Sequence, residues 1–327
     1  MNYKYKLTVA LPVYNGGVTL ARLLESLINQ QNEKVEFLLI NNNSTDNTED
    51  IVFEFMDKGL KLNYIKQIDN VGPDLNFLNC VEKSKGEYVW LVGHDDYLHE
   101  TAIDKVLAQL QENLDCAALV TDFSLKENGC LLVENYIGIN ESISVYSPES
   151  LIASVGLDFN FLSCVVHKRD LFLSAHPHKY FKSNWLQLGV FLEYIENQKV
   201  CLLAFPVVIN AGNSIDGDAN VGGKSIKVIL NLLRISMLFK DVYGENYTNL
   251  AKRYIFRHLN RKIAIAKRTP YKVNMQDYKL FFIAYAKNPF FWFVTTPLYV
   301  LPRPIHVGLY ALYKQLNLKS LAWKLFR

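Results

Sequence analysis

Two adjacent aspartates, Asp95 and Asp96, closely follow a run of apolar residues at 88–92. Carboxylate oxygens are the ligands that hard divalent cations prefer, and such a cation can neutralise the phosphate oxygens of a leaving group. The same two side chains could instead only cap the helix that begins near His99. The pair therefore indicates either a divalent-cation site beside a phosphate or a capping turn. The positions of the surrounding strands and helices distinguish these two interpretations.

Polar side chains also follow two earlier apolar runs. Tyr14 and Asn15 come after the run at 7–13, and residues 41–43 come after the run at 35–40. Because segments with helical spacing separate these runs, we expect alternating strands and helices in a parallel sheet with right-handed crossovers. Ligands of such sheets bind at the carboxyl ends of the strands. We therefore expect the polar clusters to meet at one edge of the sheet.

The apolar pattern predicts an α/β fold for the first part of the chain. The expected strands cover residues 7–13, 35–40, 62–65, 88–92 and 117–121, with helices at 20–28, 73–83, 101–113 and one that begins near 44–46. Beyond residue 126 we expect a hairpin turn at 128–129, strands at 161–167 and 200–209, and an amphipathic helix at 185–195. Residues 210–223 are rich in Gly, Asn and Asp and predict a mobile loop, followed by helices at 226–239 and 250–266.

The composition is that of a folded intracellular protein. Half of the 327 residues are hydrophobic and 20% are charged, which is enough apolar sequence for a substantial core. The five cysteines show no metal-binding spacing and indicate free thiols in a reducing compartment. There is no signal-peptide pattern, and no apolar stretch approaches the roughly 20 residues of a spanning helix. The sequence thus predicts a cytoplasmic protein.

Five short motifs resemble, in order and spacing, those of the family 2 glycosyltransferases over about residues 5–125. They are Leu11-Pro12-Val13-Tyr14-Asn15, the run from Ile40 to Thr48, Asn70-Val71-Gly72, Lys85-Gly86-Glu87-Tyr88, and Gly93-His94-Asp95-Asp96-Tyr97-Leu98. The resemblance implies a GT-A fold, which is a Rossmann-like, mostly parallel sheet with flanking helices. It also implies transfer with inversion from a nucleotide-diphosphate sugar donor to a glycan or polyprenyl-linked acceptor, with Mn²⁺ or Mg²⁺. The motifs look particularly like those of bacterial surface-polysaccharide (O-antigen or capsule) enzymes.

The resemblance also implies roles for single residues. Asp95 matches the metal-coordinating aspartate, with Asp96 beside it, and His94 matches a position that often contacts the ribose or the ion. Tyr14 matches a residue that packs against the nucleobase. Asn41 matches a position that commonly holds an aspartate, which accepts a hydrogen bond from uracil. The other expected members of the nucleotide site are Pro12, Asn15, Asn43, Asn70 and Asp74, of which Asn43 could equally be a turn residue.

The acidic motif departs from the family pattern. Gly93 stands at the first place of the common Asp-x-Asp-Asp, and His94 stands where the Gly-Asp-Asp-Asp variant has its first aspartate. The site therefore has one carboxylate fewer, from which we expect weaker metal affinity or a larger role for water and donor phosphates.

The general base is not evident from the sequence. Inverting transfer needs a carboxylate that takes the proton of the acceptor hydroxyl, and in the family this aspartate starts a helix downstream of the sheet. The corresponding stretch, 183–187, contains no carboxylate. The candidates are Glu193 on the same helix, Asp158 before the expected strand at 161–167, and Asp216 or Asp218 in the Gly-rich loop, which could close over the donor.

The carboxyl-terminal part has an unusual charge. Residues 224–327 contain 19 Lys or Arg against three Asp or Glu, together with the aromatic run at 290–293. Aromatic residues bordered by cations suit the headgroup region of an anionic membrane, although they could also pack inside a helical subdomain. We expect a GT-A catalytic domain at 1–223 and a basic helical extension at 224–327 that holds the protein on the inner face of the cytoplasmic membrane. No nucleic-acid-binding module accompanies the basic charge.

Two rival functions remain at this point. The protein could be a catalytically inactive nucleotide-sugar-binding or scaffold protein of a polysaccharide assembly complex. This function would explain why the acidic motif has one carboxylate fewer and why no general base is evident. A nucleotidyltransferase would need a cationic, Gly-rich phosphate loop after the first strand, and residues 14–19 contain no cation.

Overall fold

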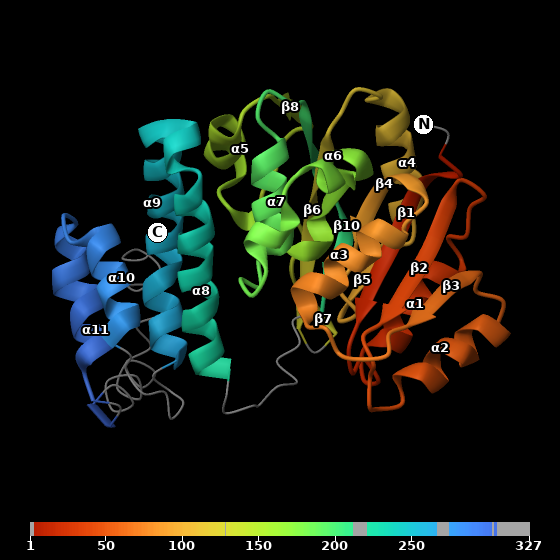
Figure 1. The fold of residues 1–327 in the computed structure, drawn as a ribbon, viewed down its shortest axis with the longest axis horizontal. Coiled ribbons are helices and arrows are strands. Elements are labelled where there is room, and N and C mark those ends of the chain that lie inside the picture. Colours follow the sequence, from red (N-terminus) through yellow and green to blue (C-terminus); the bar gives the residue numbers. More distant parts are fainter. Residues whose placement is uncertain (1–2, 128, 212–220, 267–274, 303, 306–327) are drawn as a thin grey trace. The chain divides into compact units, whose positions relative to one another are not determined.

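The computed structural model of the protein describes residues 3–305 apart from 128, 212–220, 267–274 and 303 (Figure 1). Its contacts divide the chain into two compact units, Met1–Ser214 and Ile215–Arg327, and each is described by itself. Within the described residues, one sheet of ten strands forms the first unit, with the main order β3-β2-β1-β4-β9-β6-β10-β5. The expected assignment of functions to two domains stays a prediction.

The first half of the sheet is parallel, as predicted. It consists of β1 (Tyr5–Val13), β2 (Val35–Asn41), β3 (Leu62–Lys66) and β4 (Gly86–Leu91). All residues of β2 and the last seven of β1 are buried, which explains their continuous apolar sequences. The register pairs Val13 with Asn41 and Ala10 with Leu91, so the carboxyl ends of these strands lie at one edge.

Four helices connect and flank these strands. They are α1 (Leu20–Ile28), α2 (Thr48–Asp57), α3 (Pro73–Lys83) and α4 (Ala102–Glu112). Helix α1 buries the leucines at 20, 23, 24 and 27, so its predicted apolar stripe is confirmed. Pro73 occupies the first turn of α3, where its missing N–H costs no hydrogen bond. Helix α3 contacts β1, β2 and β4 and so covers the parallel half of the sheet.

The second half of the sheet is mixed. Strand β9 (Val165–Lys168) lies antiparallel between β4 and β6 (Ala118–Glu127), and β10 (Val200–Asn210) runs parallel to β6. The register of β10 shifts on both sides of Pro206, which cannot donate a ladder hydrogen bond. Strand β5 (Asp96–Leu98) pairs with the end of β10. Strand β5 was not predicted, and the strand predicted at 161–167 is wrong for 161–164, because Phe161 lies in a bend and the next three residues form the 3-10 turn η2 (Leu162–Cys164).

Smaller elements complete the first unit. They are β7 (Cys130–Val133), β8 (Ile143–Val145), α5 (Pro148–Val155), η1 (Asp158–Asn160), α6 (Arg169–Ser174), η3 (Pro177–Tyr180) and α7 (Leu186–Tyr194). Strands β6 and β7 form the hairpin predicted around 128–129. The prediction that α7 is amphipathic is wrong. Eight of its nine residues are buried because it packs against α3, α6 and η3.

The second unit is helical in its described part, as predicted. It contains α8 (Val221–Leu238), α9 (Lys240–Ala266), α10 (Met275–Tyr285), the π-helical turn η4 (Phe291–Thr295) and α11 (Thr296–Val300). Helices α8 and α9 pack against each other, and α9 is kinked at Gly244, whose φ is 77°. Within the described residues, we find no helix with enough length and apolar character to cross a bilayer.

Candidate active site at the carboxyl ends of the strands

The loops that follow β1 and β2 are joined by hydrogen bonds. The backbone N–H of Asn15 donates to Ser44 Oγ over 2.9 Å, and the N–H of Thr45 donates to Asn15 Oδ1 over 2.9 Å. Asn15 itself has a φ of 52°, a conformation that asparagine tolerates better than most residues. The N–H of Gly17 donates to Asp46 Oδ2 over 2.9 Å. These hydrogen bonds join the two loops, residues 14–17 and 43–46, into one continuous surface at the edge of the sheet, which we call the rim.

Tyr14 stands on this rim with 42% of its surface exposed, so a flat aromatic ring is available to a ligand. Pro12, by contrast, is buried within β1 and acts on the backbone only. Asn43 is half-buried and has a φ of 57°, which fits its interpretation as a turn residue. Tyr14 and Asn15 are therefore more accessible to a ligand than Pro12 or Asn43.

Asn41 is fully buried at the end of β2. Its Oδ1 accepts a hydrogen bond from the N–H of Ser44 (2.8 Å), and its Nδ2 donates to the hydroxyl of Tyr64 (3.0 Å). Both ends of the amide are thus engaged inside the protein. A base-reading role for Asn41 stays a prediction, and in this conformation the side chain shapes the turn that carries Ser44.

Asn42 was not singled out from the sequence, yet it connects the loops after β2 and β3. It is 2% exposed. Its Oδ1 accepts from the N–H of Val71 (2.9 Å), and its Nδ2 donates to Asn70 Oδ1 (2.9 Å). Asn70 Oδ1 also accepts from the N–H of Gly72, whose φ is 82°. The predicted donor-pocket residue Asn70 is therefore held in place by a buried amide.

The two aspartates of the acidic turn have different environments. Asp95 is exposed, whereas Asp96 is 2% exposed at the start of β5. The Asp96 carboxylate accepts hydrogen bonds from Ser163 Oγ over 2.5 Å and from Asn210 Nδ2 over 2.9 Å. Burial and the neighbouring charge of Asp95 raise the pKa of Asp96 well above its usual range, although these two hydrogen bonds oppose the shift. Asp96 thus anchors the turn to η2 and β10, and Asp95 is the carboxylate that faces outward.

His94 and Arg22 flank the exposed carboxylate. The Nδ1 of His94 lies 2.9 Å from Thr19 Oγ1, so the imidazole is fixed to the loop that follows β1. Arg22 on α1 donates from Nη2 to the backbone oxygen of Asp95 over 3.2 Å. Together these bonds tie the acidic turn to the first loop, as expected for clusters that share one sheet edge.

The candidate bases fall in different places. Glu193 does not face open solvent; its carboxylate accepts hydrogen bonds from Tyr180 (2.6 Å) and His176 and lies 3.5 Å from Lys179 Nζ. Burial would raise its pKa, but the hydrogen bonds from Tyr180 and His176 outweigh burial and lower it. Asp216 and Asp218 lie outside the described residues. Asp158 is half-buried at the start of η1. All four assignments stay predictions.

Asp74 lies at the start of α7, beside the stretch 183–187 in which the resemblance implies the base. Its side chain comes from α3, is 5% exposed, and accepts from the backbone N–H groups of Asn184 (3.2 Å) and Leu186 (3.4 Å). Burial raises its pKa, and these backbone hydrogen bonds oppose the shift. Lys182 and Asn184 have φ values of 64° and 60°, so Asp74 stabilises a strained loop.

The residues present fit a divalent cation only in part. Among the described residues, no group of three or more His, Cys, Asp or Glu side chains is arranged to hold a metal ion. Asp95 and the Nε2 atom of His94 are adjacent donors, while both oxygens of Asp96 are engaged. Cations that bind substrate phosphates need few protein ligands, because phosphate oxygens and water complete their shell. The site thus fits a cation bound together with a diphosphate.

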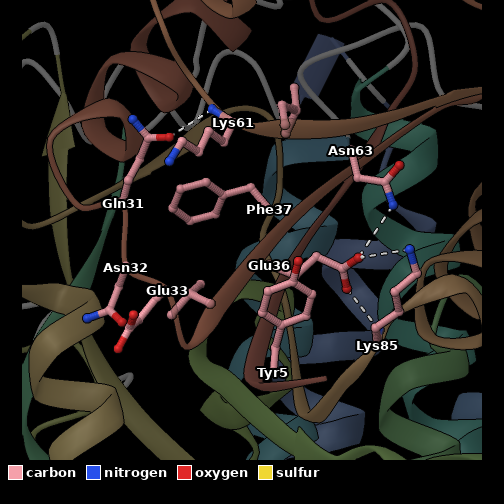
Figure 2. Close-up of a pocket in the computed structure, with 11 residues that line it drawn as sticks. Tyr5, Gln31, Asn32, Glu33, Glu36, Phe37, Lys61, Asn63 and Lys85 are labelled. Carbon is pink, nitrogen blue, oxygen red and sulfur yellow. Dashed lines mark hydrogen bonds and ion pairs between the residues drawn. The ribbon is translucent and has the colours of Figure 1, made fainter. Parts of the chain in front are cut away.

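A cavity of about 550 Å³ lies at the opposite, amino ends of β1, β2 and β3 (Figure 2). Glu36 at its rim accepts hydrogen bonds from Thr8 Oγ1 (2.8 Å) and the N–H of Lys85 (2.8 Å) and stands beside Asn63. Because the carboxylate is 5% exposed and engaged on several sides, it stabilises the turn after α3. None of the predicted site residues lines this cavity.

Comparison with known proteins agrees with this geometry. Residues 8–130 match the family model described as Glycosyl transferase family 2. Abequosyltransferase RfbV of Salmonella typhimurium is 27% identical over 264 residues, which cover 73% of this chain and 76% of that protein. An uncharacterized glycosyltransferase of Mycoplasma pneumoniae, a homolog of MG025, is 31% identical over 46% of this chain and 52% of its own length.

Solved structures show the same fold. The crystal structure of S. aureus TarS 1–349 in complex with UDP-GlcNAc superposes with a TM-score of 0.62 at 18% identity, over 85% of this chain and 79% of that one. The mixed, mostly parallel sheet with its flanking helices is accordingly of the GT-A type. The motifs, the fold and the family match together identify residues 8–130 as a segment of the glycosyl transferase family 2 type.

Proposed function

We propose that this glycosyltransferase transfers a sugar, with inversion, from a nucleoside diphosphate sugar to a glycan or lipid-linked acceptor of a bacterial surface polysaccharide. The observation that carries the proposal is the rim itself. An exposed aromatic ring, an exposed carboxylate and an imidazole lie on loops that hydrogen bonds join at one sheet edge. TarS, which shares the fold, was solved with UDP-GlcNAc, and RfbV is named an abequosyltransferase.

The donor would lie across the loops after β1, β2 and β3. Tyr14 offers the face on which a nucleobase can stack, and Asn15 and Asn70 border it. Because Asn42 and Asn41 fix these loops from inside, the pocket is preorganised before the donor binds. Polar groups of this rim would hydrogen-bond the nucleobase and so determine which nucleotide binds.

Asp95 would hold the cation, with His94 beside it. A bound divalent cation supplies charge that stabilises the departing nucleoside diphosphate. Thr19 fixes the His94 ring through Nδ1, so Nε2 is the ring atom left to meet a ligand. Arg22 holds the backbone oxygen of Asp95 and so orients the turn that carries the carboxylate.

The acceptor hydroxyl must lose a proton during attack, and Asp216 and Asp218 remain our candidates for the base. Glu193 is less suitable because its hydrogen bonds with Tyr180 and His176 lower its pKa and occupy its oxygens. Asp74 is buried and bound by backbone N–H groups, so we assign it a positioning role at the start of α7.

The helical second unit would contact an anionic membrane. Phe290, Trp292 and Phe293 are exposed by 61%, 45% and 81%, and the exposed cations Lys279 and Lys287 lie near them in the chain. Exposed aromatics with cations suit the interfacial layer of a bilayer, where a lipid-linked acceptor would be found. If the full chain stays in the supernatant when it is sedimented with anionic vesicles at low salt, this part of the proposal fails.

A thermal-shift panel of nucleoside diphosphates, each with and without Mn²⁺, tests the donor and cation together. We expect one base to stabilise the protein most and Mn²⁺ to enlarge the shift, with Asp95→Ala removing the enlargement only. No stabilisation by any nucleoside diphosphate would refute the proposal. Donor hydrolysis by the wild-type protein that Asp95→Ala abolishes would exclude the rival, catalytically inactive sugar-binding protein.

A further inference from the structure

One buried carboxylate fixes the loop at 136–139 to β6. Asp122 is fully buried, and its two oxygens accept hydrogen bonds of 2.8, 2.9 and 3.1 Å from the backbone N–H groups of residues 137–139. The N–H of Tyr136 donates to the backbone oxygen of Phe123 over 2.9 Å. A buried carboxylate is tolerated when several donors meet it, and it then restricts the backbone that supplies them. Asp122 therefore stabilises one defined conformation of the loop from inside the protein.

Tyr136, the first residue of this loop, presents an exposed aromatic ring. The ring stacks on that of Phe123 with centroids 4.7 Å and planes 21° apart, and Phe123 contacts the ring of Phe161 with centroids 4.4 Å apart. Phe123 is buried, whereas Tyr136 is 38% exposed, so Phe123 supports one face of the Tyr136 ring and leaves the remainder to solvent. In the described part of the chain the Tyr136 hydroxyl makes no hydrogen bond. We call these three rings the Tyr136 platform.

The Tyr136 platform adjoins the acidic turn. Phe161 lies two residues before Ser163, whose hydroxyl donates to the Asp96 carboxylate. Phe123 lies on β6 opposite the last residues of β10, where Asn210 also donates to Asp96. The rings and the acidic turn therefore share one part of the sheet edge.

The Tyr136 platform and the proposed nucleobase ring lie on opposite sides of the acidic turn. In the sheet order β6 is three places from β1, and β4, which leads into the turn, lies between them. Adjacent strands are about 4.8 Å apart, so β6 is about 14 Å from β1 across the sheet. Tyr14 follows β1, whereas Phe123 belongs to β6. In-line transfer needs the nucleotide and the acceptor on opposite sides of the sugar that moves, and this spacing agrees with that requirement.

Polar side chains directly precede the exposed ring. Glu134 and Asn135 are both exposed, and neither side chain makes a hydrogen bond within the described residues. The C–H groups of a pyranose pack on the electron-rich face of an aromatic ring, and its hydroxyl groups hydrogen-bond to carboxylate and amide groups. A hydrocarbon chain would use the ring but neither polar group. An exposed ring with a carboxylate and an amide beside it therefore favours a sugar.

We propose that Tyr136 binds the acceptor sugar, which is the pyranose whose hydroxyl group receives the transferred glycosyl group. This sugar stacks on the exposed part of the Tyr136 ring, with Glu134 and Asn135 beside its hydroxyl groups. In the transfer, the acceptor oxygen bonds to the anomeric carbon of the donor sugar and gives its proton to the general base, while the bond from that carbon to the diphosphate oxygen breaks. Tyr136 is thus a binding residue, and Asp122 positions it through the loop. This inference rests on the proposed function and names the residue that determines its acceptor specificity.

Saturation-transfer NMR tests the proposal with the methyl α- and β-glycopyranosides of glucose, galactose and mannose. Each is titrated into the full chain in the presence of Mn²⁺ and the nucleoside diphosphate that gives the largest thermal shift. We expect at least one glycoside to bind and Tyr136→Ala to weaken its binding about tenfold, as loss of an aromatic contact does. Tyr136→Phe keeps the ring and should stay within about threefold of the wild-type protein. Sorbitol, a hexitol without a ring, should not displace the glycoside.

Tyr146→Ala is the matched control. Tyr146 is an exposed tyrosine of the same unit that directly follows β8, and β8 pairs with the first residues of β10, at the opposite end of that strand from Asn210. Its replacement should leave glycoside binding unchanged. Unchanged binding in Tyr136→Ala, or an equal loss in both alanine variants, would overturn the location. Displacement of the glycoside by sorbitol, or a loss in Tyr136→Phe as large as in Tyr136→Ala, would overturn the stacking.

The thermal shift with nucleoside diphosphate shows that each variant is folded, and it separates this proposal from the proposed function. If the wild-type protein binds a nucleoside diphosphate but none of the glycosides, the assignment of Tyr136 is wrong while the proposed function stands. Absence of nucleoside diphosphate binding would instead refute the proposed function.

Discussion

Removing the carboxylate of Asp74 should loosen the first turn of α7. In Asp74→Ala, the N–H groups of Asn184 and Leu186 lose their acceptor. Loss of a helix cap costs about 0.5–2 kcal/mol, and a buried donor left without a partner costs about 1–3 kcal/mol. Water can reach the exposed Asn184 but not the buried Leu186, and removal of a buried carboxylate gives back part of the loss. We therefore expect a net destabilisation of about 2 kcal/mol.

Urea unfolding followed by tryptophan fluorescence measures this loss, since Trp185 sits in the affected loop. Asp69→Ala is the matched control, because Asp69 is an exposed acid of the loop before α3 with no contact in the described residues. The control should unfold within about 0.5 kcal/mol of the wild-type protein. If Asp74→Ala were as stable as this control, the capping role and the argument for a positioned loop would both be wrong.

The pH dependence of this residue has a definite sign. Burial raises the pKa of Asp74 in the folded protein above the ordinary value of 3.8. A group that binds its proton more tightly when folded contributes stability that is complete below the unfolded pKa and declines as the pH rises through the folded pKa. The stability difference between the wild-type protein and Asp74→Asn should therefore shrink over the pH interval that begins near 3.8 and extends through the raised, folded pKa. A difference that grows over this interval would contradict the assigned environment.

Four further predictions concern other parts of the molecule. Asp95→Asn should lower the rate of transfer at least about a hundredfold while nucleoside diphosphate binding without metal is kept, as kinetics and thermal shift would show. His167 should stay neutral between about pH 5 and pH 8 in NMR titration, because burial lowers its pKa to about 3. Its bond with the Tyr194 hydroxyl, 2.7 Å long, makes Tyr194→Phe destabilising by about 1–3 kcal/mol in urea unfolding. Trp292→Ala combined with Phe293→Ala should weaken sedimentation with anionic vesicles about tenfold, whereas equal binding would place these side chains away from the lipid.

The parallel half of the sheet could be predicted from the sequence because its signals are local. Strands β1, β2 and β4 are short apolar runs that are almost entirely buried, β3 is a half-buried edge strand, and the helices between them carry their own periodicity and turn residues. The meeting of the polar clusters followed from topology alone, since parallel strands end at one edge. Local pattern and global arrangement agree in this region.

The rest depended on partners that are distant in sequence. Asp96 accepts hydrogen bonds from Ser163 and Asn210, which lie 67 and 114 residues away in the sequence. No pattern in the sequence near Asp96 predicts that its side chain is buried. The burial of α7 follows from its packing against α3 and α6, which the residues of 186–194 do not encode by themselves. The link from Asp74 to Leu186 spans 112 residues, so the carboxylate that caps α7 could be found only in the structure.

The adjacent aspartates show why a motif read as a pair can provide one ligand. Asp95 belongs to the turn before β5, and a Cβ placed at Gly93 would lie 2.9 Å from Asp95 Oδ1 and 3.1 Å from Asp96 Oδ2, so the two carboxylates are neighbours. Both oxygens of Asp96 already accept hydrogen bonds, from Ser163 and Asn210, which leaves Asp95 as the exposed carboxylate of the pair in this conformation. Replacing Asp96 by a neutral residue should then affect transfer only by shifting the turn that carries Asp95. Asp96→Asn should alter stability and the rate of transfer while the shift with Mn²⁺ and nucleoside diphosphate persists, and loss of that shift would make Asp96 a ligand after all.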